Sequence, residues 1–109
     1  MEVYYDDPKF QERCENERER RRKWGPICAK KLATRLRDLA IAETLDDMRA
    51  LPGRCHELHH NWAGHLALDL DGGMRLIIRP KEWTTNSTGG LDWKAVTAVV
   101  IVTIEDYHQ

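Results

Sequence analysis

The fold is decided by the stretch Val96-Thr97-Ala98-Val99-Val100-Ile101-Val102-Thr103-Ile104. Every residue in it except Ala98 is β-branched, and β-branched side chains have stiff χ1 angles that suit a pleated strand better than a helix. Both sets of alternating side chains are mainly apolar, which is typical of an interior strand covered on both faces. Because Glu105-Asp106-Tyr107-His108 follows directly, this strand carries a carboxylate, a phenol and an imidazole to the rim of the sheet.

The alternation along this strand determines which of the polar side chains can act together. If it continues unbroken, Asp106 and His108 extend the Val100–Val102 face, and Tyr107 points the other way. All three can serve one site only if the chain twists or bulges after Ile104. We therefore predict a departure from regular pairing there, since a straight strand would leave His108 as the working residue.

Length and composition indicate one small globular domain. The chain has 109 residues, of which 41% are hydrophobic and 32% are charged, and this is enough to bury a core of its own. No apolar run approaches the roughly 18–20 residues of a membrane span, and the N-terminus does not resemble a signal peptide, so no membrane partner is expected. The three cysteines are odd in number and lack C-x-x-C spacing, which favours reduced thiols in the cytoplasm.

Two helices are predicted in the first half of the chain. Asp7-Pro8 supplies an N-cap and a first-turn proline for a helix that continues to about Lys23. Gly25-Pro26 ends that helix and begins a second one, from about Ile27 to Glu43. The polar side of the second helix, opposite its leucine stripe, is expected to hold Lys31, Arg35 and Asp38.

Short strands account for most of the remainder. They are predicted at Glu2–Tyr5, Cys55–Leu58, His65–Leu70 and Met74–Arg79, in addition to the terminal run. A long polar loop, Trp83–Gly90, precedes the last strand, and Trp93 after it is expected to be structural. This order predicts an α+β fold in a single domain, residues 1–109: an N-terminal strand and a two-helix hairpin packed on a small antiparallel-rich sheet of about four to five strands.

The charge is unevenly distributed. From Arg18 to Arg37 there are nine Lys/Arg and one acid, whereas residues 1–17 hold two bases and six acids, and residues 38–71 hold two bases and seven acids. A basic block in a chain of net charge −1 creates a local positive field, which attracts phosphate or an acidic protein surface. The alternative is that these residues form the solvated face of a helix.

A second group of residues could cleave RNA without a metal ion. Such cleavage needs a group that takes the proton of the 2′-hydroxyl, a group that protonates the leaving 5′-oxygen, and cations beside the phosphate. Histidine suits the proton steps near neutral pH, and the planar fork of arginine suits phosphate. Asp106, Tyr107 and His108 with Arg75 and Arg79 contain all of these groups. The alternative is that the arginines form surface ion pairs and the three terminal residues form a solvated end.

The histidines are clustered. His56, His59, His60 and His65 lie within ten residues, next to Cys55. Zinc sites need two pairs of ligands at structural spacing, which this segment lacks, and on a strand the neighbours His59 and His60 would point apart. We therefore expect no metal and no cofactor, and we expect His59 and His60 to line the same groove as Arg75.

Taken in order, several stretches resemble the RelE/HigB-type toxins of bacterial type II toxin–antitoxin systems, the plasmid maintenance killer proteins. The stretches span nearly the whole chain. They are Lys23-Trp24-Gly25-Pro26-Ile27-Cys28-Ala29-Lys30-Lys31, Leu51-Pro52-Gly53-Arg54-Cys55-His56-Glu57-Leu58, Leu66-Ala67-Leu68-Asp69-Leu70-Asp71-Gly72, Met74-Arg75-Leu76-Ile77-Ile78, Gly89-Gly90-Leu91-Asp92-Trp93 and Ile104-Glu105-Asp106-Tyr107-His108.

The resemblance implies a RelE-like fold and a ribosome-dependent mRNA endonuclease, held inactive by a HigA-like helix-turn-helix antitoxin. Asp106, Tyr107 and His108 match the catalytic end of the family, and Arg75 matches the strand arginine near the scissile phosphate. His59 occupies the position where the family often has a lysine. The basic helices would then contact ribosomal RNA. The residues expected to bind RNA are Arg79, Arg20, Arg21, Arg22, Lys23, Lys30 and Lys31.

Two other functions fit parts of the pattern. One is a toxin homologue that is not an enzyme, either of the gyrase-inhibiting kind or a degenerate module that only binds its antitoxin. The other is a zinc-dependent hydrolase built on the histidines. An intact Asp106-Tyr107-His108 end weighs against the first of these, because a module that only binds has no need of it.

Overall fold

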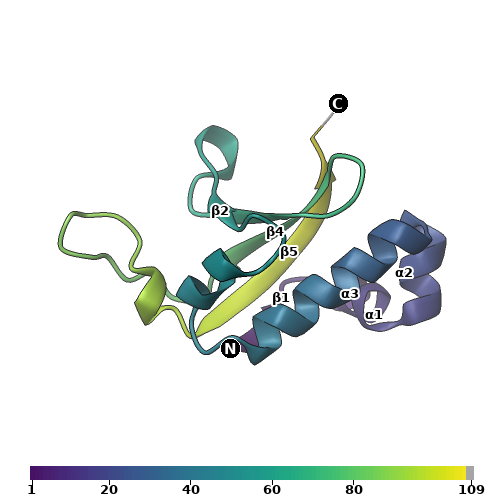
Figure 1. Cartoon of the computed structure of the whole chain (residues 1–109), viewed down its shortest axis with the longest axis horizontal. Coiled ribbons are helices and arrows are strands. Elements are labelled where there is room, and N and C mark those ends of the chain that lie inside the picture. The colour runs from purple at the N-terminus through teal and green to yellow at the C-terminus, as the bar shows by residue number, and fades with distance from the viewer. Residues whose placement is uncertain (108–109) are drawn as a thin grey trace.

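The computed structural model describes residues 1–107, in which a five-stranded mixed sheet carries three α-helices on one face (Figure 1). In chain order the elements are β1 (Glu2–Tyr5), α1 (Pro8–Glu15), α2 (Glu17–Trp24), α3 (Pro26–Ile41), the 3-10 turn η1 (Leu45–Ala50), β2 (His56–Glu57), η2 (His60–Trp62), β3 (Leu66–Asp69), β4 (Met74–Pro80), η3 (Trp93–Ala95) and β5 (Ala98–Asp106). The strand order is β1-β5-β4-β3-β2, with β1 parallel to β5 and the other neighbouring pairs antiparallel. The predicted α+β class and the interior position of the terminal strand are confirmed.

The face of the sheet that packs on the helices, here called the helix-covered face, holds the main hydrophobic core. Fully burying a leucine or isoleucine side chain stabilises a fold by about 1.5–3 kcal/mol, so this layer is the main source of stability. Its fully buried members from α3 and the strands are Leu32, Leu39, Leu66, Leu68, Leu76, Ile78, Val99 and Ile101. The alternate residues of the strands point to the opposite side, which we call the open face.

The N-terminal helical region is divided in two, whereas the sequence predicted one continuous helix. Asn16 is the last cap of α1 and the first cap of α2, and its side chain accepts a 2.9 Å hydrogen bond from the backbone N–H of Glu19. Arg20 reaches back and donates to the carbonyl of Cys14 at 2.6 Å, which satisfies an end of α1. An asparagine that ends one helix and caps the start of the next is a strong local reason for the chain to break the helix at that point.

Helix α3 also differs from its prediction in one residue. Arg35 was expected on the exposed polar side, but it is only 8% exposed, and its Nε donates a 3.0 Å hydrogen bond to the backbone carbonyl of Asp69 on β3. The long aliphatic stem of an arginine can cover apolar surface while its polar end finds a partner, so the helical pattern alone did not reveal this burial.

The terminal strand contains a bulge. Ile77 of β4 pairs with Thr103, but Ile78 pairs with Ile101, which leaves Val102 without a partner on β4. Pairing is then regular up to Asp106, so the predicted departure after Ile104 is wrong and the irregularity lies earlier. The alternation could not reveal this position, because Val102 is as apolar as its neighbours.

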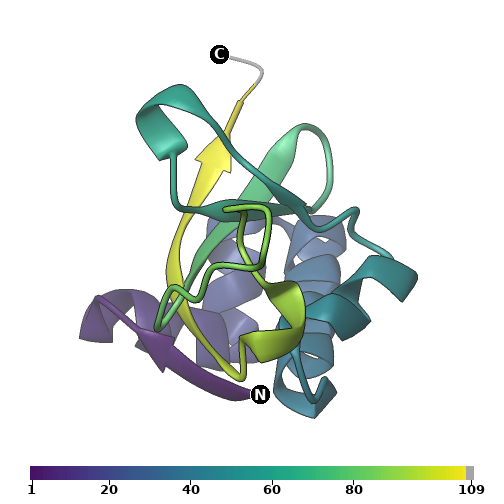
Figure 2. The ribbon, with the colours of Figure 1, turned by 90° about the vertical axis from the view of Figure 1, so that its left-hand side faces the viewer.

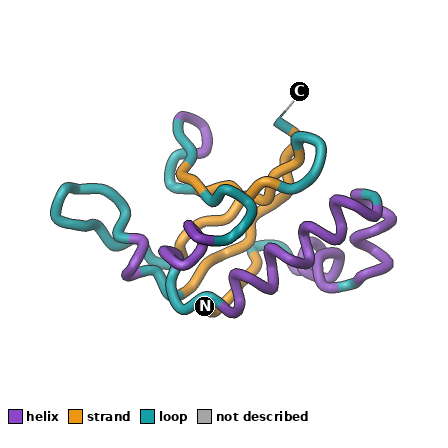
Figure 3. The backbone as a smooth tube through the Cα atoms, in the orientation of Figure 1, coloured by secondary structure: helices purple, strands orange, loops and turns teal. Residues whose placement is uncertain are grey.

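The connections lie around the two ends of the sheet. The C-terminal end of β5 and the η2 connection lie at the same end of the molecule in both ribbon views, opposite the N-terminus (Figures 1 and 2). The loop between β4 and η3 projects from the body at the other end (Figure 3). No helix among residues 1–107 is long and apolar enough to cross a membrane.

Candidate functional site

A row of alternating charges crosses the open face of the sheet. Asp69, Arg75 and Glu105 are register partners on β3, β4 and β5. Arg54, just before β2, extends the row: its Nε lies 2.9 Å from Oδ2 of Asp69, and its Nη2 lies 3.4 Å from Oδ1. At the other end, Nη2 of Arg75 lies 3.2 Å from Oε2 of Glu105. We call these four residues the charge row.

Tyr107 lies against this row. The guanidinium carbon of Arg75 is 4.7 Å from the centroid of the Tyr107 ring, which is the geometry of a cation–π contact. The bulge at Val102 makes this contact possible, because it turns Thr103 and Glu105 to the open face and Ile104 to the helix-covered face. Arg75 and Tyr107 therefore form one unit at the end of β5.

The two arginines of the row are unequally accessible. Only 16% of the Arg75 side chain is exposed, and its Nε is buried without a hydrogen-bond partner. The Arg54 side chain is 64% exposed. The pKa of Arg54 is raised above its ordinary value, first by the hydrogen bond to Asp69 and by the charge of that carboxylate, and further by the Tyr107 side chain. Arg54 is thus a permanent cation at the surface of the row.

The backbone around Arg54 is held in an unusual conformation. Arg54 has a φ of 49° and Gly53 a φ of 112°. A Cβ on Gly53 would lie 2.6 Å from Nε of Arg35, so only glycine fits between the turn and that buried arginine. The backbone N–H of Asp69 donates a 2.7 Å hydrogen bond to the carbonyl of Gly53, which ties the same turn to β3.

His56 lies on the open face beside the charge row. It pairs with Ala67, which pairs in turn with Ile77, so it belongs to the next row of side chains along the sheet. Its Nδ1 is 2.7 Å from the carbonyl oxygen of Arg54. A carbonyl can only accept, so Nδ1 carries a proton, and in the neutral ring Nε2 is the acceptor.

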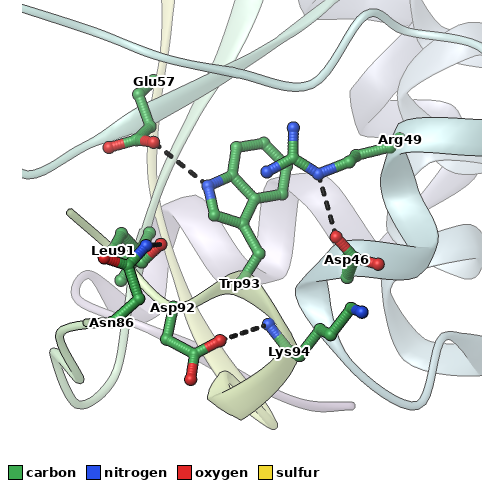
Figure 4. Close-up of polar contacts among 8 residues, drawn as sticks. All are labelled: Asp46, Arg49, Glu57, Asn86, Leu91, Asp92, Trp93 and Lys94. Carbon is green, nitrogen blue, oxygen red and sulfur yellow. Dashed lines mark hydrogen bonds and ion pairs between the residues drawn. The ribbon is translucent and has the colours of Figure 1, made fainter. Parts of the chain in front are cut away.

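Trp93 holds the short strand β2 in place. The indole Nε1 of Trp93 donates a 3.0 Å hydrogen bond to Oε2 of Glu57, as Figure 4 shows. The guanidinium of Arg49 lies 3.7 Å from the centroid of the Trp93 ring and forms an ion pair with Asp46 at 2.9 Å. Trp93 is 5% exposed, which confirms its predicted structural role. Because Glu57 is held on one face, His56 is directed to the other.

The structure brings together some of the predicted site residues and separates others. Arg75 and Tyr107 are in contact. Asp106 pairs with Met74, a residue of the helix-covered face, so the register places Asp106 on the opposite face from Arg75. His108 lies outside the described residues.

The predicted histidines of the groove lie off the sheet. His59 is the exposed N-cap residue of η2, and His60 opens that turn with a φ of 57°. The η2 connection leaves the β2 edge on the side away from the helices (Figure 1). Arg79 lies four residues from Arg75 on the same face of β4 and donates a 3.0 Å hydrogen bond to Asp6.

The basic residues of α2 and α3 form a separate surface. Arg22 pairs with Glu19 at 2.8 Å, and Lys31 pairs with Asp71 at 3.3 Å. Arg21 lies 4.0 Å from Glu17, and Arg20 is used in the junction with α1. Exposed pairs of this kind contribute little to stability, and most of these cations stay at the surface. The exposed members are Arg18, Arg21, Arg22, Lys23, Lys30 and Arg37.

No group of three or more His, Cys, Asp or Glu side chains within residues 1–107 is arranged to hold a metal ion. The four clustered histidines are dispersed by their backbone. His56 lies on the open face of the sheet, and His59 and His60 flank the start of η2. His65 packs edge-on against Trp62 at a centroid distance of 5.1 Å. The polar groups that this face presents are the guanidinium, carboxylate, phenol and imidazole side chains described above.

Sequence reasoning missed three members of the site: Arg54, Asp69 and Glu105. All three lie in stretches that carry the family resemblance, but resemblance alone gives them no role. The signal that could have found them is the opposition of unlike charges across predicted neighbouring strands, and that requires the register. Glu105 in particular lies opposite Arg75 because the bulge at Val102 shifts the alternation of β5 by one residue.

Comparison with known proteins gives a match at the level of the fold. No family model and no curated protein matches the sequence. Among solved structures, a YoeB/ParE toxin from Agrobacterium tumefaciens superposes with a TM-score of 0.57 at 10% identity, over 97% of this chain and 98% of that one. The chain therefore has the fold of a RelE/ParE-type toxin, over its full described architecture.

Proposed function

We propose that this protein is the toxin of a type II toxin–antitoxin system and acts in the cytoplasm as a metal-independent, ribosome-dependent mRNA endonuclease. Its inhibitor would be a HigA-like helix-turn-helix antitoxin. The observation that carries the proposal is the stack of Arg75 on Tyr107. It combines a guanidinium for phosphate and an aromatic ring for a base on one open face, next to the imidazole of His56. The fold shared with a YoeB/ParE toxin supports it.

The proposed reaction is an internal transfer of the phosphodiester. The 2′-oxygen attacks phosphorus while the bond from phosphorus to the 5′-oxygen breaks. One group accepts the proton of the 2′-hydroxyl, and another delivers a proton to the leaving 5′-oxygen. The products are a 2′,3′-cyclic phosphate and a 5′-hydroxyl, so no water and no metal enter this step.

The side chains divide these tasks. His108 is the principal acid–base group and delivers the proton to the leaving 5′-oxygen, while Nε2 of His56 can accept the proton of the 2′-hydroxyl. Arg75 counters the charge that develops on the phosphate oxygens and fixes Tyr107, which stacks on a base or shares the proton work. Asp106, on the other face, supports the end of β5, and His59 assists from η2.

The remaining cations would hold the larger RNA. The exposed arginines and lysines of α2 and α3 form a positive surface away from the charge row, and Arg79 adds a cation on the open face of the sheet. Contacts with phosphates release counterions, so binding through this surface should weaken steeply with salt. We assign it to ribosomal RNA, because mRNA cleavage on the ribosome needs the enzyme to dock beside its substrate.

The test is translation of a defined mRNA in a purified system. Wild-type protein should cut the mRNA on the ribosome and leave cyclic phosphate ends, and His108→Ala should reduce cutting by about 10²-fold or more, the usual weight of an acid–base group. His65→Ala removes an imidazole that packs on Trp62, and it should cut like the wild type. Intact mRNA with the wild-type protein, or unimpaired cutting by His108→Ala, contradicts the proposal. Growth arrest with DNA damage and uncut mRNA would instead favour the non-enzymatic toxin.

A further inference from the structure

We propose that Arg54 is a further RNA-binding residue of this site and contacts the phosphodiester backbone, with Asp69 as its internal counter-ion in the free chain. The choice of RNA as the ligand rests on the proposed function. The geometry of the cation itself does not, because it is a property of the charge row and of the turn that carries it.

Accessibility is the first reason. Arg75 is only 16% exposed, because it lies between the Glu105 carboxylate and the Tyr107 ring. The Arg54 side chain is 64% exposed, so a phosphate that approaches the open face meets this arginine first. Arg54 is therefore the more accessible cation of the row, whereas Arg75 is engaged with Glu105 and Tyr107.

The built turn is the second reason. A non-glycine residue at a φ of 49° carries strain, which persists only when the surroundings fix it. Here the buried Arg35 occupies the space where a Cβ on Gly53 would lie, and the Asp69 N–H fixes the carbonyl of Gly53. This turn therefore holds the backbone of Arg54 at the edge of the charge row. Strain of this kind is typical of residues that are positioned for a ligand.

The neighbouring groups also fit a nucleotide. The Arg54 guanidinium lies close enough to the Tyr107 side chain to be influenced by it. A base stacked on Tyr107 would bring its own phosphate within reach of that guanidinium, since the arginine fork recognises phosphate oxygens in pairs. Asp69 holds the fork in place but also repels a phosphate, so its charge lowers the affinity of the site.

These opposing roles define the experiment. The probe is a fluorescein-labelled single-stranded RNA octamer with 2′-deoxy substitutions, which cannot undergo 2′-hydroxyl attack, and binding is followed by anisotropy at several salt concentrations. Arg54→Gln removes the cation, and Arg13→Gln, on the exposed side of α1, is its matched control. Asp69→Asn keeps one acceptor for Arg54 and removes the negative charge. Its control is Asp46→Asn, which alters an ion pair of the same 2.9 Å length beside Trp93.

We expect Arg54→Gln to weaken binding about tenfold, the weight of one charge-assisted contact, and to lower the salt slope by about 0.7. Asp69→Asn should tighten binding about threefold more than Asp46→Asn does, because it removes a charge beside the ligand. Thermal melts of the four variants check that each is folded. Equal binding by Arg54→Gln and Arg13→Gln would overturn the proposal, and so would weaker binding by a folded Asp69→Asn.

The octamer assay separates this inference from the proposed function. If the wild-type protein leaves mRNA uncut on the ribosome but binds the octamer through Arg54, the endonuclease proposal fails and the Arg54 site stands. If the wild-type protein cuts mRNA but Arg54→Gln binds the octamer as tightly as Arg13→Gln does, the Arg54 site is wrong and the endonuclease proposal stands.

Discussion

Arg75 and Glu105 face each other across neighbouring strands, with 3.2 Å between Nη2 and Oε2, at a position where neither side chain is more than 31% exposed. Removing one member leaves the other without its counter-charge in a partly dry environment. We expect Arg75→Ala to lower the free energy of unfolding by about 1–2 kcal/mol, measured by urea denaturation at pH 7. Adding Glu105→Gln should recover most of that loss without restoring mRNA cleavage. A double variant whose loss is the sum of the two single losses would contradict the pairing.

The contributions of the Tyr107 ring and of its hydroxyl to mRNA cleavage can be tested separately. Tyr107→Phe keeps the stack on Arg75 and should lower the rate of mRNA cleavage by about tenfold at most, whereas Tyr107→Ala removes the stack and should lower it by about 10²-fold. The measurement is the single-turnover cutting rate on ribosome-bound mRNA. If both variants lose activity equally, the hydroxyl rather than the ring carries the function of Tyr107.

Gly53 and Gly64 form a matched pair for the turn. Both have positive φ values, 112° and 85°, but a Cβ on Gly53 would lie 2.6 Å from Arg35, whereas a Cβ on Gly64 has nothing within 4 Å. Gly64→Ala should cost about 1 kcal/mol from strain alone. Gly53→Ala should cost about 2–4 kcal/mol and also weaken RNA binding, because it displaces Arg54. Calorimetric unfolding of the two variants gives the comparison. Equal losses in the free energy of unfolding would show that the Arg35 side chain moves aside at little cost.

Two thiols, buried Cys14 and partly buried Cys55, predict a loss of stability at alkaline pH. Burial raises the pKa of Cys14 and of Cys55 to about 12, from the usual 9.0. Between these values the unfolded chain releases thiol protons that the folded chain keeps, so the free energy of unfolding falls as pH rises above 9, by at most about 1.4 kcal/mol per pH unit for each thiol. Urea midpoints from pH 8 to 10.5 measure the slope, and Cys55→Ala should reduce it. A slope that is unchanged in that variant would contradict the assignment.

The elements of this fold could be predicted from sequence because their signals are local. The β-branched run, the Gly25-Pro26 junction and the Leu-rich face of α3 each act over a few residues. The break at Asn16 was missed for a related reason: its side chain caps the start of α2, and this cap competes with helix continuation by a small energy that charge and hydropathy patterns do not report.

The site was only partly predictable because it depends on register. Arg75 and Tyr107 were proposed, but their contact and the displacement of Asp106 to the other face follow from Val102, which looks like any other strand valine. Arg54 was missed because its position comes from a left-handed turn and a buried arginine, and both are tertiary features.

The bulge at Val102 has a consequence for comparing relatives of this protein. Because the bulge takes up one extra residue, a relative that lacks this residue can pair regularly through the strand and still present the counterparts of Thr103 and Glu105 to the open face. An alignment that keeps the two chains in step through the strand would then equate side chains from opposite sides of the sheet. Equivalent residues at the chain end must be counted from the bulge, and a gap of one there carries more functional meaning than many substitutions elsewhere.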